Sequence, residues 1–201
     1  MKKMISNFID DNTFQELNVV KSIKTTRLSS AIDHANQESP NAVIVEIASI
    51  GKIKFLCVHF DRTYKMGTIG VYEGEKITLA FEYAIKKLPV ITVVASGGIR
   101  VQERTMALMQ MIKMASAVKR HKDKGLLYIS VVTNPSLGGA SASFVSLADI
   151  IIAETGATYG FSGRRIIEDT THERLPDDFQ TAEYAKQHGM VDIVADSEIR
   201  S

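Results

Sequence analysis

The chain has 201 residues, of which 45% are hydrophobic and 23% are charged, and this predicts one globular domain of ordinary composition. A net charge of +1 argues against a general nucleic-acid binder, and the longest apolar runs are too short to cross a membrane. The N-terminus has no apolar signal-peptide region, and Cys57 is the only cysteine, so we expect a cytoplasmic protein without a disulfide or a cysteine-rich zinc site.

The first half of the chain predicts an arm, a hairpin, a helix and a strand. Residues 1–40 are polar and weakly patterned, so we expect a partly disordered arm, with one helix in LSSAIDHANQESP. The runs NAVIVEIASI and KIKFLCVHF predict a β-hairpin around Gly51. A loop, MGTIGVYEGEK, then leads into a helix in EKITLAFEYAIKK, and Pro89 opens the strand VITVVAS.

The second half alternates helices and strands. A helix is expected from about Arg100 to Lys124 with Gly125 as its cap, followed by the strand LLYISVV. The loop TNPSLGG, a small-residue helix start in ASASFVSLAD and the strand IIIAE come next. TAEYAKQHGMVDIV predicts a helix, a glycine cap and a short strand. This alternation predicts a largely parallel α/β domain over residues 41–201.

Two glycine pairs follow buried strands and precede helical patterns: Gly97-Gly98 in VVASGGIR and Gly138-Gly139 in TNPSLGGASASF. Unpaired backbone N–H groups at such turns can form an oxyanion hole, and glycine lets a ligand approach them closely. Either pair alone could equally be a tight strand-to-helix turn. Two pairs on consecutive strands favour a site.

Other features carry weaker predictions. Arg100, Arg164 and Arg165 flank the glycine motifs and could contact phosphate or carboxylate groups. The basic run VKRHKDKG is typical of a solvated helix end, although it could attract a phosphate-bearing ligand. The methionines of TMALMQMIKMAS indicate core packing or a subunit-facing helix, and the five histidines have no metal-ligand spacing.

These motifs resemble those of the β subunit of bacterial acetyl-CoA carboxylase carboxyltransferase. The resemblance covers about residues 60–196 and includes, in order, SGG-x-R-x-QE, GG-x-SASF, GF-x-GRR and LPDDFQTAE. It implies the crotonase/ClpP-like ββα spiral fold. It also implies a hetero-oligomer with an α-type subunit, a biotin carboxyl carrier protein, and an acyl-CoA thioester as substrate.

The reaction implied by the resemblance moves a carboxyl group from carboxybiotin to acetyl-CoA or a related acyl-CoA, giving malonyl-CoA. The cofactor supplies its own base, so the protein must supply oxyanion holes and alignment. The catalytic residues expected by analogy are Gly97 and Gly98 as one hole, with Gly138 and Gly139 as backbone that shapes the pocket. The residues expected to bind substrate or cofactor are Ile99, Arg100, Ala140, Ser141, Phe161, Gly163, Arg164 and Arg165.

The sequence departs from the family pattern in two ways. The family usually carries a four-cysteine zinc ribbon, which this sequence lacks, so we expect no zinc. Ile99 stands where alanine is usual, and its larger side chain is expected to reshape the acyl or biotin pocket.

Two alternatives to an active transferase stay open, and two others are disfavoured. A malonyl-type decarboxylase subunit and a non-catalytic regulatory paralogue that pairs with an α subunit both stay open. An acyl-CoA hydratase is disfavoured, because GGASAS and GFSGRR carry small residues and arginines where the acids would stand. A Clp-type protease needs a Ser-His-Asp set, and none is evident.

Overall fold

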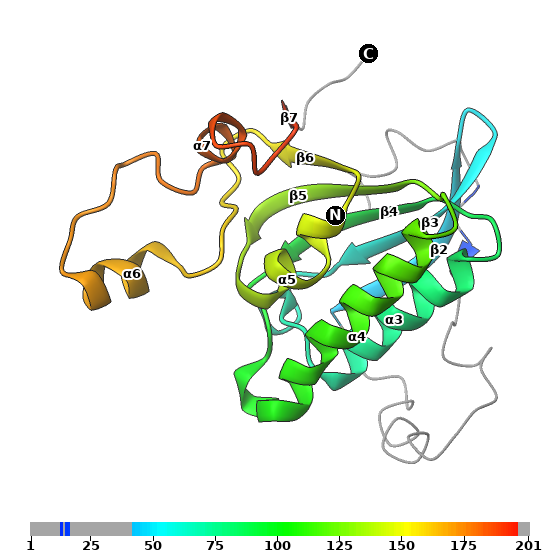
Figure 1. The fold of residues 1–201 in the computed structure, drawn as a ribbon, viewed down its shortest axis with the longest axis horizontal. Helices are drawn as coiled ribbons and strands as arrows, with labels where there is room; N and C mark the ends of the chain where they lie inside the picture. Colours follow the sequence, from blue (N-terminus) through cyan, green and yellow to red (C-terminus); the bar gives the residue numbers. More distant parts are fainter. Residues whose placement is uncertain (1–12, 14, 17–41, 197–201) are drawn as a thin grey trace.

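The computed structural model describes Thr13, Gln15–Glu16 and residues 42–196 of the chain. The rest of the predicted arm, including its helix before Pro40, lies outside the described residues. Within the described part, seven strands form one sheet in chain order (Figure 1). They are β1 (Gln15–Glu16), β2 (Val43–Ile50), β3 (Ile53–Phe60), β4 (Val90–Ser96), β5 (Tyr128–Ser136), β6 (Ile150–Glu154) and β7 (Ile193–Ala195).

The sheet is antiparallel at one edge and parallel through the rest. β1, β2 and β3 pair in antiparallel fashion, and the pairs from β3 to β7 are parallel. The predicted hairpin around Gly51 is therefore confirmed, and β4 has the bounds expected from VITVVAS. Because β4 and β5 are parallel neighbours, the two glycine pairs that follow them emerge at the same edge of the sheet.

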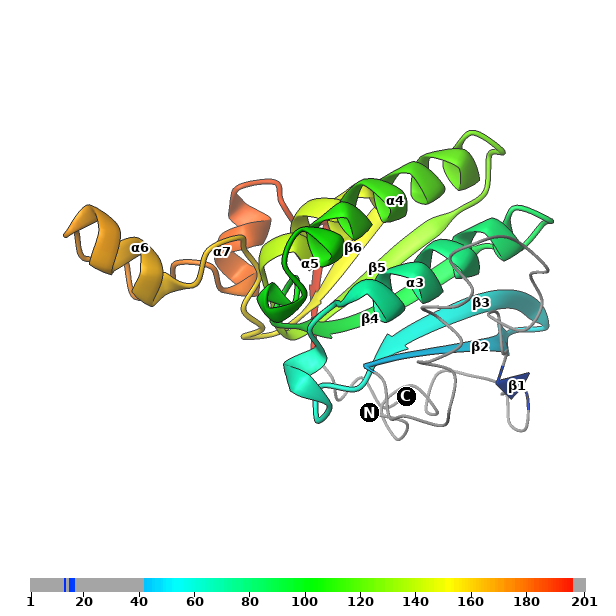
Figure 2. The same ribbon diagram turned by 90° about the horizontal axis from the view of Figure 1, so that it is seen from below.

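Helices connect the parallel strands. The described helices are α3 (Val71–Ala84), α4 (Arg104–Lys122), α5 (Gly138–Ser143), α6 (Arg164–Thr171) and α7 (Ala182–Gln187), with short 3₁₀ turns η1 (Lys65–Gly67), η2 (Val101–Glu103) and η3 (Val145–Leu147). Figure 2 shows α3 and α4 side by side on one face of the sheet, while α6 lies far from the sheet. None of the described helices is long and apolar enough to cross a membrane.

The start of α3 differs from the prediction. The loop expected up to Lys76 is already helical from Val71. Gly74, which sequence reasoning assigned to that loop, lies inside the helix where α3 packs on α4. A Cβ atom at Gly74 would overlap the side chain of Gln110. This glycine therefore serves helix packing, and the sequence pattern alone does not distinguish that use from a loop.

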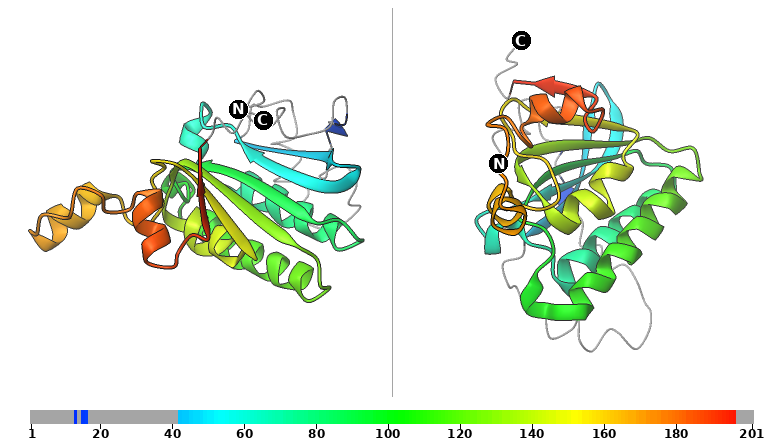
Figure 3. Two further views of the ribbon diagram at one scale, coloured as in Figure 1. Left: turned by 90° about the horizontal axis from the view of Figure 1, so that it is seen from above. Right: turned by 60° about the vertical axis from the view of Figure 1, so that its left-hand side comes forward.

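Aromatic contacts fasten the helical layer to the sheet. Phe144 follows α5 and stacks on Phe60 of β3, with ring centroids 6.0 Å apart. Phe81 of α3 meets Tyr128 of β5 edge-on, with centroids 4.9 Å apart. All four rings are fully buried, so they fix α3 and the end of α5 against the sheet. Figure 3 shows α5 next to α4.

A buried ion-pair network joins the segment after β4 to the start of α3. The Arg100 guanidinium donates to Glu73 at 2.8 Å and to Glu103 at 2.7 Å. It also donates to the carbonyl oxygen of Thr68 at 2.7 Å and to the Thr68 hydroxyl at 3.3 Å. Arg100 and Glu73 are buried, and the pairing of both charges compensates for the loss of their hydration.

The same two carboxylates cap α3. Glu73 accepts a hydrogen bond from the Gly70 N–H at 2.9 Å, and Glu103 accepts one from the Val71 N–H at 2.6 Å. These amides lie at the helix start, where no intrahelical acceptor exists. The Glu103 cap comes from a residue 32 positions away, so the helix begins earlier than local sequence indicates.

The network shifts the pKa of Glu103. Partial burial alone would raise this pKa, but hydrogen bonds from the Val71 N–H and Arg100, together with the positive charges of Arg100 and Lys65, lower it below its ordinary value of 4.5. A carboxyl with a lowered pKa stabilises the folded state above its unfolded-state pKa. That contribution is lost as the pH falls through the folded-state value.

We therefore predict that Glu103→Gln destabilises the protein at neutral pH, and that the difference from wild type shrinks as the pH falls below 4.5. The measurement is urea unfolding followed by circular dichroism across this pH range. Glu173→Gln, at an exposed glutamate with no ion pair among the described residues, is the control. A difference between wild type and Glu103→Gln that stays constant with pH would contradict the prediction.

Candidate functional site: two glycine pairs at the sheet edge

The two glycine pairs lie against each other. Gly98 has φ +101°, and a Cβ atom there would lie 3.1 Å from the carbonyl oxygen of Leu137 and 3.3 Å from Cα of Gly138. Such a backbone conformation and such crowding are compatible only with glycine. The two pairs on consecutive strands are therefore in contact, and the place where they meet is built from main-chain atoms.

Three of the four glycine amides, however, have acceptors within the chain. The Gly97 N–H donates to the Met66 carbonyl at 3.0 Å, the Gly98 N–H to Ser96 Oγ at 3.1 Å, and the Gly138 N–H to the Phe161 carbonyl at 2.8 Å. The helix expected from about Arg100 begins as the 3₁₀ turn η2 at Val101 and becomes α-helical only at Arg104, so no α-helix N-terminus directly follows Gly97-Gly98. These three amides fix the loops to one another and are not free donors.

The amides of Ile99, Gly139 and Ala140 have no acceptor within the described part of the chain, and the last two lie in the first turn of α5, where no intrahelical acceptor exists. The amides of Ile99 and Gly139 are those on either side of Gly98. Ile99 forms a parallel bridge with Ile69, in which the Ile69 N–H donates to Gly98 and the Arg100 N–H donates to Ile69, each at 2.8 Å. Since N–H groups alternate sides along an extended segment, the Ile99 N–H faces away from Ile69.

The Gly139 amide nitrogen lies 3.3 Å from the position that a Cβ atom on Gly98 would occupy. Ile99 follows Gly98 directly in the chain. The Ile99 and Gly139 amides therefore lie around Gly98, where the Leu137 carbonyl oxygen also lies, 3.1 Å from the position of a Cβ atom. Unpaired N–H donors can stabilise an oxygen atom that carries negative charge.

The side chain of Ile99 packs inward. It lies so close to Gly139 that a Cβ atom at Gly139 would overlap it, and that Cβ atom would also lie 3.0 Å from Met111 Sδ of α4. The side chain is partly buried against the main core. Its size therefore acts first on the position of Gly139, the residue that carries one of the unpaired amides.

The three arginines predicted to bind ligand have different surroundings. Arg100 uses four of its five N–H groups in the buried network, which leaves little for a phosphate. Arg164 donates to the carbonyl oxygens of Leu175 and Pro176 and pairs with Glu168, so it connects α6 to the segment that follows it. The Arg165 side chain is 94% exposed, and it is the one of these three whose guanidinium faces solvent.

The remaining predicted residues lie around the second glycine pair. Ala140 is fully buried, and the Ser141 hydroxyl contacts the carbonyl oxygens of Gly138 at 2.8 Å and of Gly160 at 2.5 Å. Phe161, by contrast, is 62% exposed beside the site, and Gly163 precedes α6. Ser141 thus holds backbone in place.

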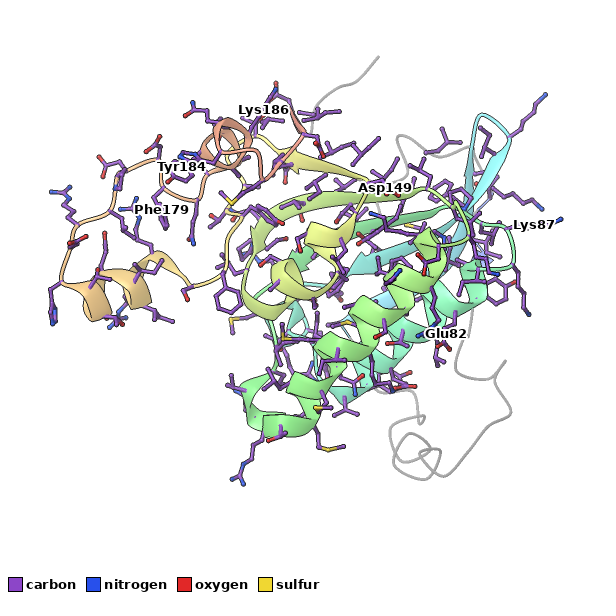
Figure 4. The ribbon with its side chains drawn as sticks, viewed as in Figure 1. Glu82, Lys87, Asp149, Phe179, Tyr184 and Lys186 are labelled. Atoms are coloured by element: carbon purple, nitrogen blue, oxygen red, sulfur yellow. The ribbon has the colours of Figure 1, made fainter. Side chains whose placement is uncertain are left out.

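No side chain of the described site offers an obvious nucleophile. Burial, with a smaller effect from the charge of Glu46, raises the pKa of the Cys57 thiol to about 12, which keeps it protonated and inert. No group of three or more His, Cys, Asp or Glu side chains in the described residues could hold a metal ion. The basic run at the end of α4 is paired, with Arg120 on Glu82 and Lys122 on Asp149; Figure 4 labels both acidic residues.

An exposed apolar surface lies beside the site; a subunit-facing helix was one of the two interpretations of the methionine-rich stretch, but the other residues of this surface were not predicted. The surface consists of Met66, Val101, Met106, Leu108, Met109, Ile112 and Phe161, and we call it the apolar face. The methionine-rich stretch thus divides, because Met114 is fully buried while Met106 and Met109 are exposed. The signal was the heptad-like spacing of Val101, Leu108 and Ile112, which local patterning does not separate from a core-facing stripe.

The chain matches the family model described as "Carboxyl transferase domain" over residues 1–200. It is 42% identical over 203 residues to acetyl-coenzyme A carboxylase carboxyl transferase subunit beta 1 of Lachnospira eligens, covering 96% of this chain and 78% of that protein.

Solved structures share the fold. A transcarboxylase 12S structure with methylmalonyl-coenzyme A bound superposes with a TM-score of 0.80 at 25% identity, covering 97% of this chain but only 38% of that one. A Pseudomonas malonate decarboxylase hetero-tetramer in complex with malonate gives a TM-score of 0.78 at 18% identity, covering 98% of this chain and 76% of that one. The expected crotonase-like α/β fold is confirmed, and the chain belongs to the carboxyl transferase domain family.

Proposed function

We propose that this chain is the β-type subunit of a biotin-dependent acyl-CoA carboxyltransferase. It moves a carboxyl group from carboxybiotin on a carrier protein to acetyl-CoA or a related acyl-CoA, giving malonyl-CoA or its analogue. The observation that carries the proposal is the pair of unpaired amides at Ile99 and Gly139, on either side of Gly98. The 42% identity to a named β subunit supports the same function.

The two amides act on charge that develops during the reaction. When the thioester methyl loses a proton, negative charge gathers on the thioester oxygen, and two fixed N–H donors stabilise it. Carboxybiotin, when bound, supplies the carboxyl group and the base, so the chain needs no acidic or basic side chain there. We assign the oxyanion donors to Ile99 and Gly139, while the amides of Gly97, Gly98 and Gly138 hold those donors in place.

The apolar face supports the need for an α-type partner. Exposed apolar residues that gather on one surface commonly mark an interaction site, and Met66 and Phe161 of the apolar face lie beside the glycine pairs. α6 adds a second unpartnered element, since none of its residues is buried and Ile166 is exposed (Figure 1). We propose that an α-type subunit covers both elements and closes the site, and that the carrier protein brings its biotin to this closed site.

The first test is the reverse reaction, decarboxylation of malonyl-CoA in the presence of biocytin. We expect activity from this chain together with a candidate α-type subunit, and little from the chain alone. Biotin-independent release of CO₂ would favour the malonyl-type decarboxylase instead. A stable but inactive complex would favour the regulatory paralogue, and would overturn the proposal.

The assignment of the amides makes a prediction about Gly98. Gly98→Ala places a methyl group next to the Gly139 nitrogen and forces φ +101° on alanine, so we expect kcat to fall by about 100-fold or more. Gly97→Ala is the comparator, because its Cβ atom would meet Thr68 Cγ2 at an ordinary 3.4 Å and its amide is already bonded. We expect its loss of kcat to be at least about tenfold smaller.

Thermal unfolding of both variants shows whether they fold. Replacing Ile99 with its α-hydroxy acid removes only the N–H and keeps the side chain, which tests the donor without the crowding. Full kcat in that ester variant would contradict the assignment of Ile99.

The apolar face makes a prediction about assembly. Leu108→Glu combined with Ile112→Glu places two charges where the partner would exclude water, so we expect affinity for the α-type subunit to fall by at least about 100-fold. Ser116→Glu, one turn further along the same helix and outside the apolar face, is the matched control. Calorimetric titration of the two subunits measures both, and equal affinities would place the interface elsewhere.

A further inference from the structure

Residues 158–162 hold the second glycine pair from outside the helix that carries it. The Ser136 N–H donates to the carbonyl of Thr158 at 2.8 Å, and the Gly160 N–H donates back to Ser136 at 3.2 Å. Further along, the Phe161 carbonyl accepts from Gly138, and the Gly160 carbonyl accepts from the Ser141 hydroxyl. The position of Gly138-Gly139 therefore depends on where residues 160 and 161 lie.

Gln180 holds this segment from its other side. Its backbone carbonyl accepts from the Tyr159 N–H at 2.9 Å, and its side-chain Nε2 donates to the Ser162 carbonyl at 2.7 Å. The side chain lies directly over Gly160, where a Cβ atom would overlap it. Gln180 thus brackets Gly160 and Phe161, the two residues that bond to the second glycine pair.

The bonding of Gln180 is unusual for a residue with a structural role alone. It is buried, its φ is +65°, and its Oε1 atom is buried with no hydrogen-bond partner in the described residues. A buried unpaired acceptor destabilises the folded state, and a left-handed non-glycine residue adds to that cost. An apolar side chain would avoid the first cost, so what the amide provides is the directed N–H to Ser162.

The location of Gln180 also links the site to the segment that contains α6. The chain leaves the body after Ser162, forms α6, and returns at Phe179 and Gln180 (Figure 1). Figure 4 labels Phe179 and Tyr184 where the returning segment reaches α7, and their rings lie 5.3 Å apart between centroids. Gln180 therefore lies where the segment that contains α6 rejoins the body of the protein, next to the residues that bond to the second glycine pair.

From these contacts we infer that Gln180 is a positioning residue for the oxyanion donor at Gly139, acting through Ser162, Phe161 and Gly138. The inference rests on the proposed function. Loss of the Nε2 bond lets residues 160–162 shift, and the Gly139 N–H then no longer points where the oxyanion forms. Small displacements of such donors are expensive in rate.

The test is Gln180→Glu, which keeps the shape but replaces the donor with an acceptor. In the malonyl-CoA decarboxylation assay with the α-type subunit, we expect kcat to fall about 10- to 100-fold while KM for malonyl-CoA and affinity for the partner stay within about threefold. Gln187→Glu makes the same chemical change at the exposed end of α7 and is the control.

A pH profile separates positioning from a general structural defect. A protonated glutamic acid can again donate to the Ser162 carbonyl, so the kcat of Gln180→Glu relative to wild type should recover as the pH is lowered. Gln180→Gly relieves the left-handed backbone but removes the bond, and should lose kcat without losing thermal stability.

The outcomes separate the two proposals. An inactive wild-type complex would overturn the proposed function itself. If the wild-type complex is active and Gln180→Glu has the same kcat, the role of Gln180 is overturned. It is also overturned if both Gln180 variants lose thermal stability together with kcat, and the kcat of Gln180→Glu does not recover at low pH.

Discussion

The pairing of Arg100 with Glu73 and Glu103 is the constraint on which the site depends. A guanidinium removed from water must find compensating charge, and here it finds two carboxylates that also cap α3. Because Arg100 follows Ile99, this pairing fixes the backbone that carries one of the unpaired amides. Removing either carboxylate would leave Arg100 with one ion-pair partner instead of two and would remove one cap of α3.

The two halves of the site are held by different forces. The segment after β4 is fixed by ion pairs, while the segment after β5 is fixed by neutral hydrogen bonds from residues 158–162 and by the burial of Phe144 on Phe60. Charged pairs in a buried place resist displacement strongly, and neutral bonds yield at lower cost. The second half is therefore the side that contacts with another subunit could adjust, since it continues directly into α6 (Figure 2).

Much of the fold followed from local sequence. The β-branched run of VITVVAS and the two runs around Gly51 identified their strands, since period and turn residues act over a few positions. The start of α3 did not follow, because Glu103 caps it from 32 residues away. The sequence also could not show which amides stay unpaired, because the acceptors Met66 and Phe161 come close to the glycines only when the chain folds. The same holds for Arg100, whose neighbouring glycine motif suggested a ligand contact, while its partners Glu73 and Thr68 come from the start of α3 and the loop before it.

A site made from main-chain N–H groups has a consequence for how such a protein changes over time. Every residue except proline supplies the same N–H, so the chemistry at position 99 does not depend on which side chain stands there. The side chain of Ile99 faces Gly139 and Met111, where its volume can alter the width of the site without removing a donor. Under the proposed function, the width of the site and its N–H donor thus depend on different atoms of one residue, so the first can change in evolution while the second is kept.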